Sequence, residues 1–146
     1  MAPLFRAVVV WLVIIATESL YGAFRRVLLS PEIDFAVRQA SVIVGAITIF
    51  GLTWLFLSWI RIRSNRAALA MGALWVCLTL AFELALGRLT GLGWDRILAD
   101  YDLSRGGLMP LGLIAMGLTP WVVRRLQTAR AQRKLQPADR NLPRAP

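Results

Sequence analysis

The stretch WLVIIATESLYGAFRR, residues 11–26, joins an apolar run suited to a lipid bilayer to a carboxylate, Glu18, near its far end and an arginine pair just beyond. The same pattern returns in WVCLTLAFELALGR, residues 75–88, where the acid is Glu83. Acidic side chains are costly inside a membrane and usually have a specific role there. The two acids are therefore the feature that most needs a functional explanation.

The composition is that of a membrane protein rather than a soluble domain. Of the 146 residues, 58% are hydrophobic and 17% are charged, and the mean hydropathy is +0.61. Backbone amides in lipid must be hydrogen-bonded within the protein, and apolar runs without a polar face are not typical of a soluble bundle. We therefore expect an all-α integral membrane protein with four transmembrane helices of roughly 20 residues each. The four runs lie at about 7–23, 40–60, 67–87 and 106–123.

The charge distribution predicts the orientation in the membrane. The net charge is +9, and 11 of the 17 basic residues lie at the chain ends or between the second and third runs, with a single acid, Asp139. Cytoplasmic segments are enriched in arginine and lysine, so both termini are predicted to face the cytoplasm (N-in, C-in). The same asymmetry predicts attraction to anionic lipids at the cytoplasmic face and argues against nucleic acid as a partner. These basic residues are Arg6, Arg61, Arg63, Arg66, Arg124, Arg125, Arg130, Arg133, Lys134, Arg140 and Arg144.

The scarcity of reactive side chains limits the chemistry that the chain can perform. It has no histidine and one cysteine, Cys77. These counts remove Ser-His-Asp hydrolysis, haem ligation by histidine and the ordinary zinc sites. They also leave no pair of thiols for a disulfide within the chain. We expect no cofactor, and the sequence favours a protein that is not an enzyme.

Polar landmarks recur in the same order in the two halves of the chain. Each acid is followed four residues later by a glycine, Gly22 or Gly87, and a Gly-Leu-Thr triplet follows at 51–53 and at 117–119. This spacing predicts an internal duplication: two tandem helix hairpins, parallel and related by an axis along the membrane normal. The two glycines are predicted to allow close helix approach. The predicted units are a first repeat at 1–64, a second repeat at 65–124 and a basic cytoplasmic tail, partly disordered, at 125–146.

Glu18 and Glu83 define the candidate ligand or ion pocket. Residues three, four and seven positions apart share a helix face, so Tyr21 and Arg25 are expected on the face of Glu18. Two interpretations remain open. The acids line a pocket open to the outer face that binds a cation, a proton or a polar ligand, or they form ion pairs with arginines that fix helix packing. The candidate pocket residues are Glu18, Tyr21, Arg25, Glu83, Arg88 and Arg105.

The outer segment GWDRILADYDLSRGG, residues 93–107, has an unusual mixture of acids and apolar residues. Asp95, Asp100 and Asp102 are weak candidates for a calcium or magnesium site, because these ions prefer oxygen ligands. Their spacing matches no known loop. The apolar residues among the charges predict a short amphipathic helix that lies on the outer membrane interface.

Three stretches carry a resemblance: FELALGR (82–88), ILADYDL (97–103) and GGLMPLGL (106–113). Together they resemble small four-helix proteins of the bacterial inner membrane without an assigned function. The resemblance implies a multi-pass protein of the bacterial inner membrane and adds nothing about chemistry. The small multidrug exporters also have four helices and a first-helix glutamate, but this chain differs in its duplication, its longer loops and its second glutamate.

These observations predict a small non-enzymatic inner-membrane protein, an accessory, assembly or binding unit with an outward-facing polar pocket around the two glutamates. We expect a homo-oligomer or a place in a larger membrane complex, because four short helices enclose little space. One alternative is a small proton- or cation-coupled transporter or channel. A second alternative is a membrane enzyme that acts on a lipid or phosphate substrate.

Overall fold

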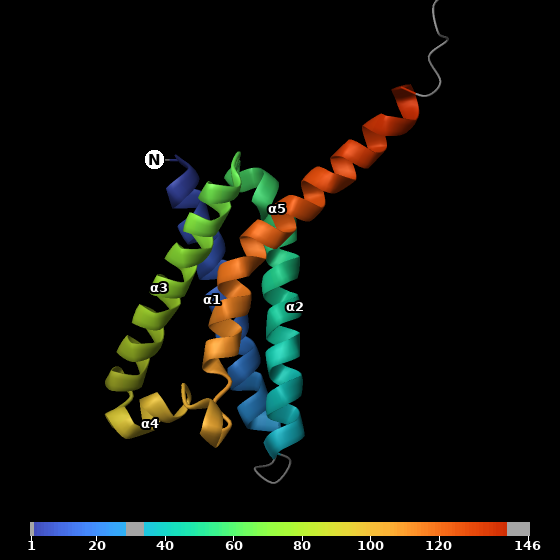
Figure 1. The fold of residues 1–146 in the computed structure, drawn as a ribbon. Coiled ribbons are helices and arrows are strands. Elements are labelled where there is room, and N and C mark those ends of the chain that lie inside the picture. The colour runs from blue at the N-terminus through green and yellow to red at the C-terminus, as the bar shows by residue number, and fades with distance from the viewer. Residues whose placement is uncertain (1, 29–33, 140–146) are drawn as a thin grey trace, which may run out of the picture.

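The computed structural model describes residues 2–28 and 34–139, and it includes the side chains of these residues except those of 2, 25–28, 34–41, 105 and 135–139. This part of the chain is all-α. Helices α1 and α3 run in one direction and α2 and α5 return, while α4 lies across one end of the bundle (Figure 1). The elements are α1 (Ala2–Leu28), α2 (Asp34–Ile60), α3 (Asn65–Leu89), α4 (Trp94–Ala99), the 3-10 turn η1 (Leu103–Arg105) and α5 (Met109–Asp139).

Three of these helices are long and apolar enough to cross a membrane. The candidate spans are Pro3–Phe24, Val42–Ile60 and Asn65–Leu89. They overlap the first three predicted apolar runs, which confirms an all-helical protein with candidate membrane-spanning helices. Helix α5 differs, because arginines follow its apolar N-terminal part from Arg124 onward. The described chain thus has three candidate spans and a C-terminal helix, where the sequence predicted four spans.

Two buried tryptophans form hydrogen bonds between the helices at the centre of the bundle. Trp75 of α3 is fully buried and donates its Nε1–H to the carbonyl oxygen of Ala7 in α1, at 2.9 Å. Trp11 of α1 donates in the opposite direction, to Thr79 Oγ1 of α3 at 3.0 Å. The Thr79 hydroxyl in turn donates to the sulfur of Met116 in α5, at 3.3 Å. Each indole N–H therefore has a partner, which removes the cost of burying it unpaired.

Helices α3 and α5 pack at backbone contact. A Cβ atom on Gly72 would overlap the carbonyl oxygen of Gly117, so only glycine fits at this point of α3. The sequence had instead suggested Gly22 and Gly87 as points of close approach. At Gly22 a Cβ would meet no described atom within 4 Å, so the described residues show no close approach there. At Gly87 the close neighbour is Ile97 of α4, at 2.9 Å from the Cβ position, and not another long helix.

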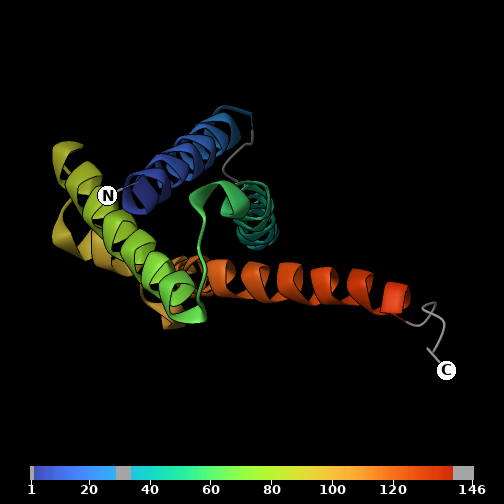
Figure 2. The same ribbon diagram turned by 90° about the horizontal axis from the view of Figure 1, so that it is seen from above.

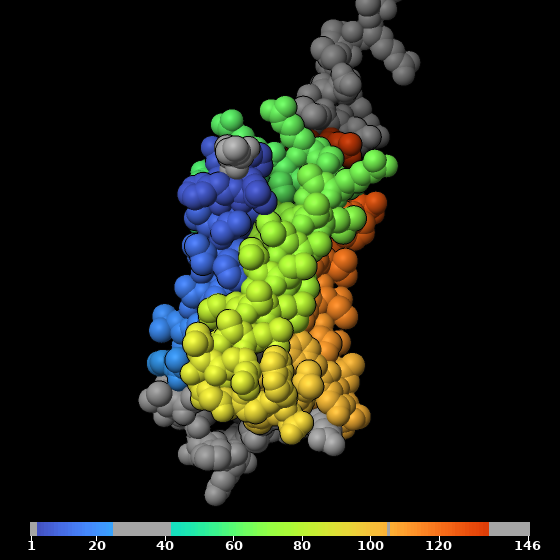
Figure 3. Space-filling model, turned by 90° about the vertical axis from the view of Figure 1, so that its left-hand side faces the viewer, coloured from blue at the N-terminus to red at the C-terminus, as the bar shows by residue number. Residues whose placement is uncertain are grey.

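The segment between α3 and α5 contains the short helix that the sequence predicted. Ile97 of α4 is buried on α3, whereas Leu98 and Trp94 are exposed, so the helix has two unlike faces. Asp102 accepts from the backbone N–H of Ser104 and begins η1. Figure 3 shows α1 and α3 side by side on one face of the molecule, with α4 at their end.

Helix α5 leaves the bundle in its C-terminal half. It lies along α2 and α3 and then extends away from them (Figures 1 and 2). Pro120 lies inside this helix and removes one backbone donor, a common cause of helix bending. The basic residues 124–134 continue the same helix. Residues 140–146, part of the tail expected to be partly disordered, lie outside the described residues.

Candidate functional site

Glu18 of α1 lies against Gly45 of α2. It is six residues before the end of its candidate span at Phe24. Its Oε2 atom is 2.9 Å from the position that a Cβ on Gly45 of α2 would occupy. Gly45 is buried and Glu18 is half-buried. The absence of a side chain at position 45 therefore gives the carboxylate its place against α2.

Glu83 lies in the corresponding place on α3, six residues before the end of its span at Leu89, and its side chain is exposed. It faces the segment after α4, where the hydroxyl of Tyr101 is buried without a hydrogen-bond partner among the described residues. Burial raises the pKa of the Tyr101 hydroxyl, and the negative charges of Glu83 and Asp100 raise that pKa further. Tyr101 is therefore a protonated phenol at neutral pH, with its O–H available as a donor.

Arg88, one of the three predicted arginine partners of the acids, has other partners. Arg88 donates Nη1–H to the carbonyl oxygen of Leu92 at 3.2 Å, and its guanidinium lies 5.1 Å from the ring centre of Trp94. It therefore stabilises the turn between α3 and α4. The side chains of Arg25 and Arg105 lie outside the described residues.

Neither glutamate forms a hydrogen bond or an ion pair with a described residue. Tyr21, the other residue predicted on the face of Glu18, is half-buried. The two carboxyls inside the candidate spans therefore each lie against one neighbouring element. Glu18 packs on α2, and Glu83 faces the Tyr101 segment.

The loop aspartates have local roles at helix ends. Asp100 forms an ion pair with Arg96, one turn earlier in α4, at 3.1 Å. Asp102 accepts from the backbone N–H of Ser104 at 3.0 Å and from its hydroxyl at 2.5 Å. Asp95 lies in the first turn of α4, where an acid favours the helix dipole. Among the described residues, no three side chains of the ligating types lie close enough to hold a metal ion.

The titration of Tyr101 offers a test of this arrangement. We expect one of the two tyrosines of the chain to ionise at a higher pH than a free tyrosine, because burial and two nearby acids disfavour the phenolate. Tyr101→Phe should remove this late transition from the ultraviolet absorbance of tyrosinate. Glu83→Gln should move it towards lower pH, whereas Asp95→Asn should leave it unchanged. An unshifted transition in Glu83→Gln would place Glu83 away from the phenol.

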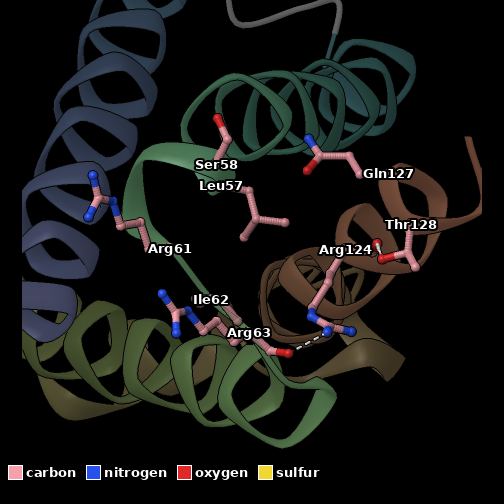
Figure 4. A pocket seen from close by; sticks show the side chains of 8 residues that line it. All are labelled: Leu57, Ser58, Arg61, Ile62, Arg63, Arg124, Gln127 and Thr128. Carbon is pink, nitrogen blue, oxygen red and sulfur yellow. Dashed lines mark hydrogen bonds between the residues drawn. The ribbon is translucent and has the colours of Figure 1, made fainter. Parts of the chain in front are cut away.

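A cavity of about 300 Å³ lies at the other end of the bundle, between the C-terminal end of α2 and α5. The sequence did not predict it. Figure 4 shows Leu57 in its middle, Arg124 and Thr128 on the side of α5, and Arg61 and Arg63 on the opposite side, with their guanidinium groups turned away from Leu57. Its polar lining consists of Ser58, Arg61, Arg63, Arg124, Gln127 and Thr128.

Two hydrogen-bonded residues of α5 hold this cavity together. Arg124 donates to the side-chain oxygen of Asn65 at 2.5 Å and to the carbonyl oxygen of Arg63 at 2.6 Å. Gln127 donates to the carbonyl oxygen of Trp54 in α2, at 2.9 Å. These three bonds join segments that are 59, 61 and 73 residues apart in the chain. Helix α5 therefore fixes the turn between α2 and α3.

The sequence signals for this cavity were the RIR triplet at 61–63 and the arginine pair at 124–125, in stretches without acids. Both had been interpreted as signals of topology and of attraction to anionic lipids. Their meeting depends on the packing of α5 against the α2–α3 turn, which local sequence does not specify.

The fold and the two groups of polar residues define the class of the protein: an all-helical membrane protein with three candidate spans. No protein-family model, curated protein or solved structure matches the chain. The resemblance to small bacterial inner-membrane proteins thus identifies no family.

Proposed function

We propose that the chain is a small non-enzymatic protein of the bacterial inner membrane that acts as an assembly or binding unit for a larger membrane complex or for a second copy of itself. In this proposal, Glu18 and Glu83 are the groups through which it engages its partner. The proposal rests on one observation: two carboxyls lie inside candidate spans with no hydrogen-bond or ion-pair partner among the described residues.

The proposed topology has four spans, with both termini in the cytoplasm. Three features support it. The N-terminus, the α2–α3 turn and the arginine-rich part of α5 lie at one end of the bundle (Figure 1), as the positive-inside rule requires of a cytoplasmic side. The apolar part of α5 packs along two candidate spans, α2 and α3. Glu18 and Glu83 each lie six residues, about 9 Å along a helix, from the outer end of a span, in helices of the same direction.

The depth of the two acids supports a partner rather than solvent as their neighbour. Acids in transmembrane helices are rare, and they generally pair with another group or face a water-filled cavity. Glu83 is exposed on the surface of its span, so a partner helix can reach it directly. A cation or hydrogen-bond donor from that helix would give the carboxyl the pairing that its own chain does not provide within the described residues.

Native mass spectrometry of the gently extracted protein tests this function. We expect wild type to carry a stoichiometric protein partner or a second copy, and Glu18→Leu/Glu83→Leu to lose it, because leucine can neither accept nor donate a hydrogen bond. Asp95→Asn/Asp100→Asn, which removes two acids of the outer segment, is the matched control and should retain the complex. Survival of the complex in the double leucine variant would refute the proposal.

A small proton- or cation-coupled transporter, with a polar pocket around the acids open to the outer face, is the second candidate. The observation that favours it is the contact of Glu18 with Gly45, which places a half-buried carboxyl between two candidate spans. In this case Glu18→Gln should abolish proton or cation flux into proteoliposomes while the protein stays folded. Flux equal to that of wild type in Glu18→Gln would exclude this role for Glu18.

A further inference from the structure

We infer that the cavity between the end of α2 and α5 is a binding site for a phosphate group, with Arg61 and Arg63 as its anion-binding side chains and Arg124 as the residue that positions them. The inference goes beyond the proposed function and does not depend on the two glutamates, which lie towards the opposite end of the bundle. A phospholipid headgroup and a small soluble phosphate compound share the chemistry that this site would recognise.

The cavity carries positive charge without a nearby carboxylate in the sequence. Three arginines line it. The chain has no aspartate or glutamate from residue 35 to residue 82, or from residue 103 to residue 138, and all of the lining belongs to these two segments. Three positive charges around one cavity repel one another, and a bound anion would lower this repulsion. The charge of the lining therefore favours a negatively charged occupant.

The hydrogen bonds separate the arginines into two roles. Arg124 uses Nη1 for Asn65 and Nη2 for the Arg63 carbonyl, so its guanidinium is already engaged. The guanidiniums of Arg61 and Arg63 are exposed and make no hydrogen bond to another described residue. Arginine offers a planar set of N–H donors that matches the oxygens of a phosphate. These two side chains are the ones that can bind a ligand.

The backbone at Arg61 provides an independent argument. Its φ is +64°, in the left-handed region that glycine adopts most readily at a helix end. An arginine there carries conformational strain, and such strained residues cluster at ligand-binding sites. Glycine would serve the turn better than arginine does. The turn alone therefore does not account for an arginine at position 61, whereas ligand binding by its side chain does.

The position of the cavity suits a phosphate at the membrane surface. Tryptophans occur at membrane–water interfaces, and three of them lie at this end of the bundle with arginines over their rings. A volume of about 300 Å³ is at the small end of ligand pockets, enough for a headgroup or a small phosphate ester. The pairs are Arg6 with Trp59 at 5.3 Å, Arg125 with Trp121 at 4.4 Å and Arg130 with Trp54 at 4.7 Å.

The test is binding to the full chain in detergent, measured by native mass spectrometry with three probes: phosphatidylglycerol, phosphatidylcholine and inorganic phosphate. We expect phosphatidylglycerol or inorganic phosphate to bind, and Arg61→Gln/Arg63→Gln to weaken that binding at least tenfold, the effect of losing one or more charge-assisted hydrogen bonds. Arg133→Gln/Lys134→Gln removes the same charge from exposed positions on the α5 extension and is the control. Its binding should stay within about twofold of wild type.

A second variant separates binding from folding. Arg61→Gly removes the guanidinium and relieves the positive φ, so it should weaken binding while the thermal midpoint stays the same or rises. Binding of phosphatidylglycerol alone identifies a headgroup site, and competition by inorganic phosphate identifies a soluble ligand; both support a phosphate site. Equal binding of phosphatidylcholine and phosphatidylglycerol, which share the phosphodiester, also supports a phosphate site. Equal weakening in the control variant or binding of no probe would overturn the inference.

Discussion

Gly72→Leu is expected to destabilise the protein by at least about 3 kcal/mol, enough to prevent recovery of a folded, monodisperse chain. A Cβ at this position overlaps the carbonyl oxygen of Gly117, and a backbone oxygen cannot move aside as a flexible side chain can. Helices α3 and α5 would have to separate. Such contacts between small residues are a main source of helix association in membranes, where lipid removes most of the hydrophobic drive between helices.

Gly22→Leu is the matched control for this prediction. It also replaces a glycine inside an apolar helix with leucine, but a Cβ there has no neighbour within 4 Å among the described residues. Its thermal midpoint, followed by tryptophan fluorescence in detergent, should equal or exceed that of wild type, because leucine favours helix over glycine. A Gly72→Leu protein that melts at the wild-type temperature would show that α3 and α5 do not meet at position 72.

The contrast between these two glycines shows what the sequence could and could not predict. The apolar runs predicted the long helices well: the run at 40–60 ends at Ile60, where α2 ends. Hydropathy depends on local composition, so it locates helices without knowledge of their neighbours. Whether a glycine touches another helix depends on how the helices pack. Gly22 was selected for its place beside an acid, whereas no local sequence feature distinguishes Gly72 and Gly45.

The same reason limits what the sequence reveals about the candidate sites. Glu18 and Glu83 stand out because an acid is unusual in an apolar run, and that signal is local. The cavity forms where the turn at 61–63 meets α5, and its arginines look like ordinary topology signals in the sequence. A useful clue was the long stretch without acids around them, since cytoplasmic basic residues on a surface are often balanced by nearby carboxylates. The positive φ of Arg61 has no sequence signal at all.

Trp75→Ala is the second substitution with a large expected effect, a loss of about 3–5 kcal/mol of stability. Trp75 is fully buried where α1, α3 and α5 meet, so alanine leaves a cavity that the surrounding helices cannot fill without moving. Its N–H bond to Ala7 is also lost. Trp94→Ala is the control: it removes the same side chain from a position that is 54% exposed, and it should cost about 1 kcal/mol or less.

Trp75→Phe divides the effect into its two causes. Phenylalanine keeps most of the ring volume and loses the N–H donor, so it should cost only about 1 kcal/mol if packing dominates. The carbonyl of Ala7 still accepts its own bond within α1, which keeps the penalty small. If Trp75→Phe loses nearly as much stability as Trp75→Ala, the hydrogen bond between α1 and α3 is the main contribution of Trp75. The hydrogen bond from Trp75 to Ala7 would then contribute more to stability than the burial of its ring.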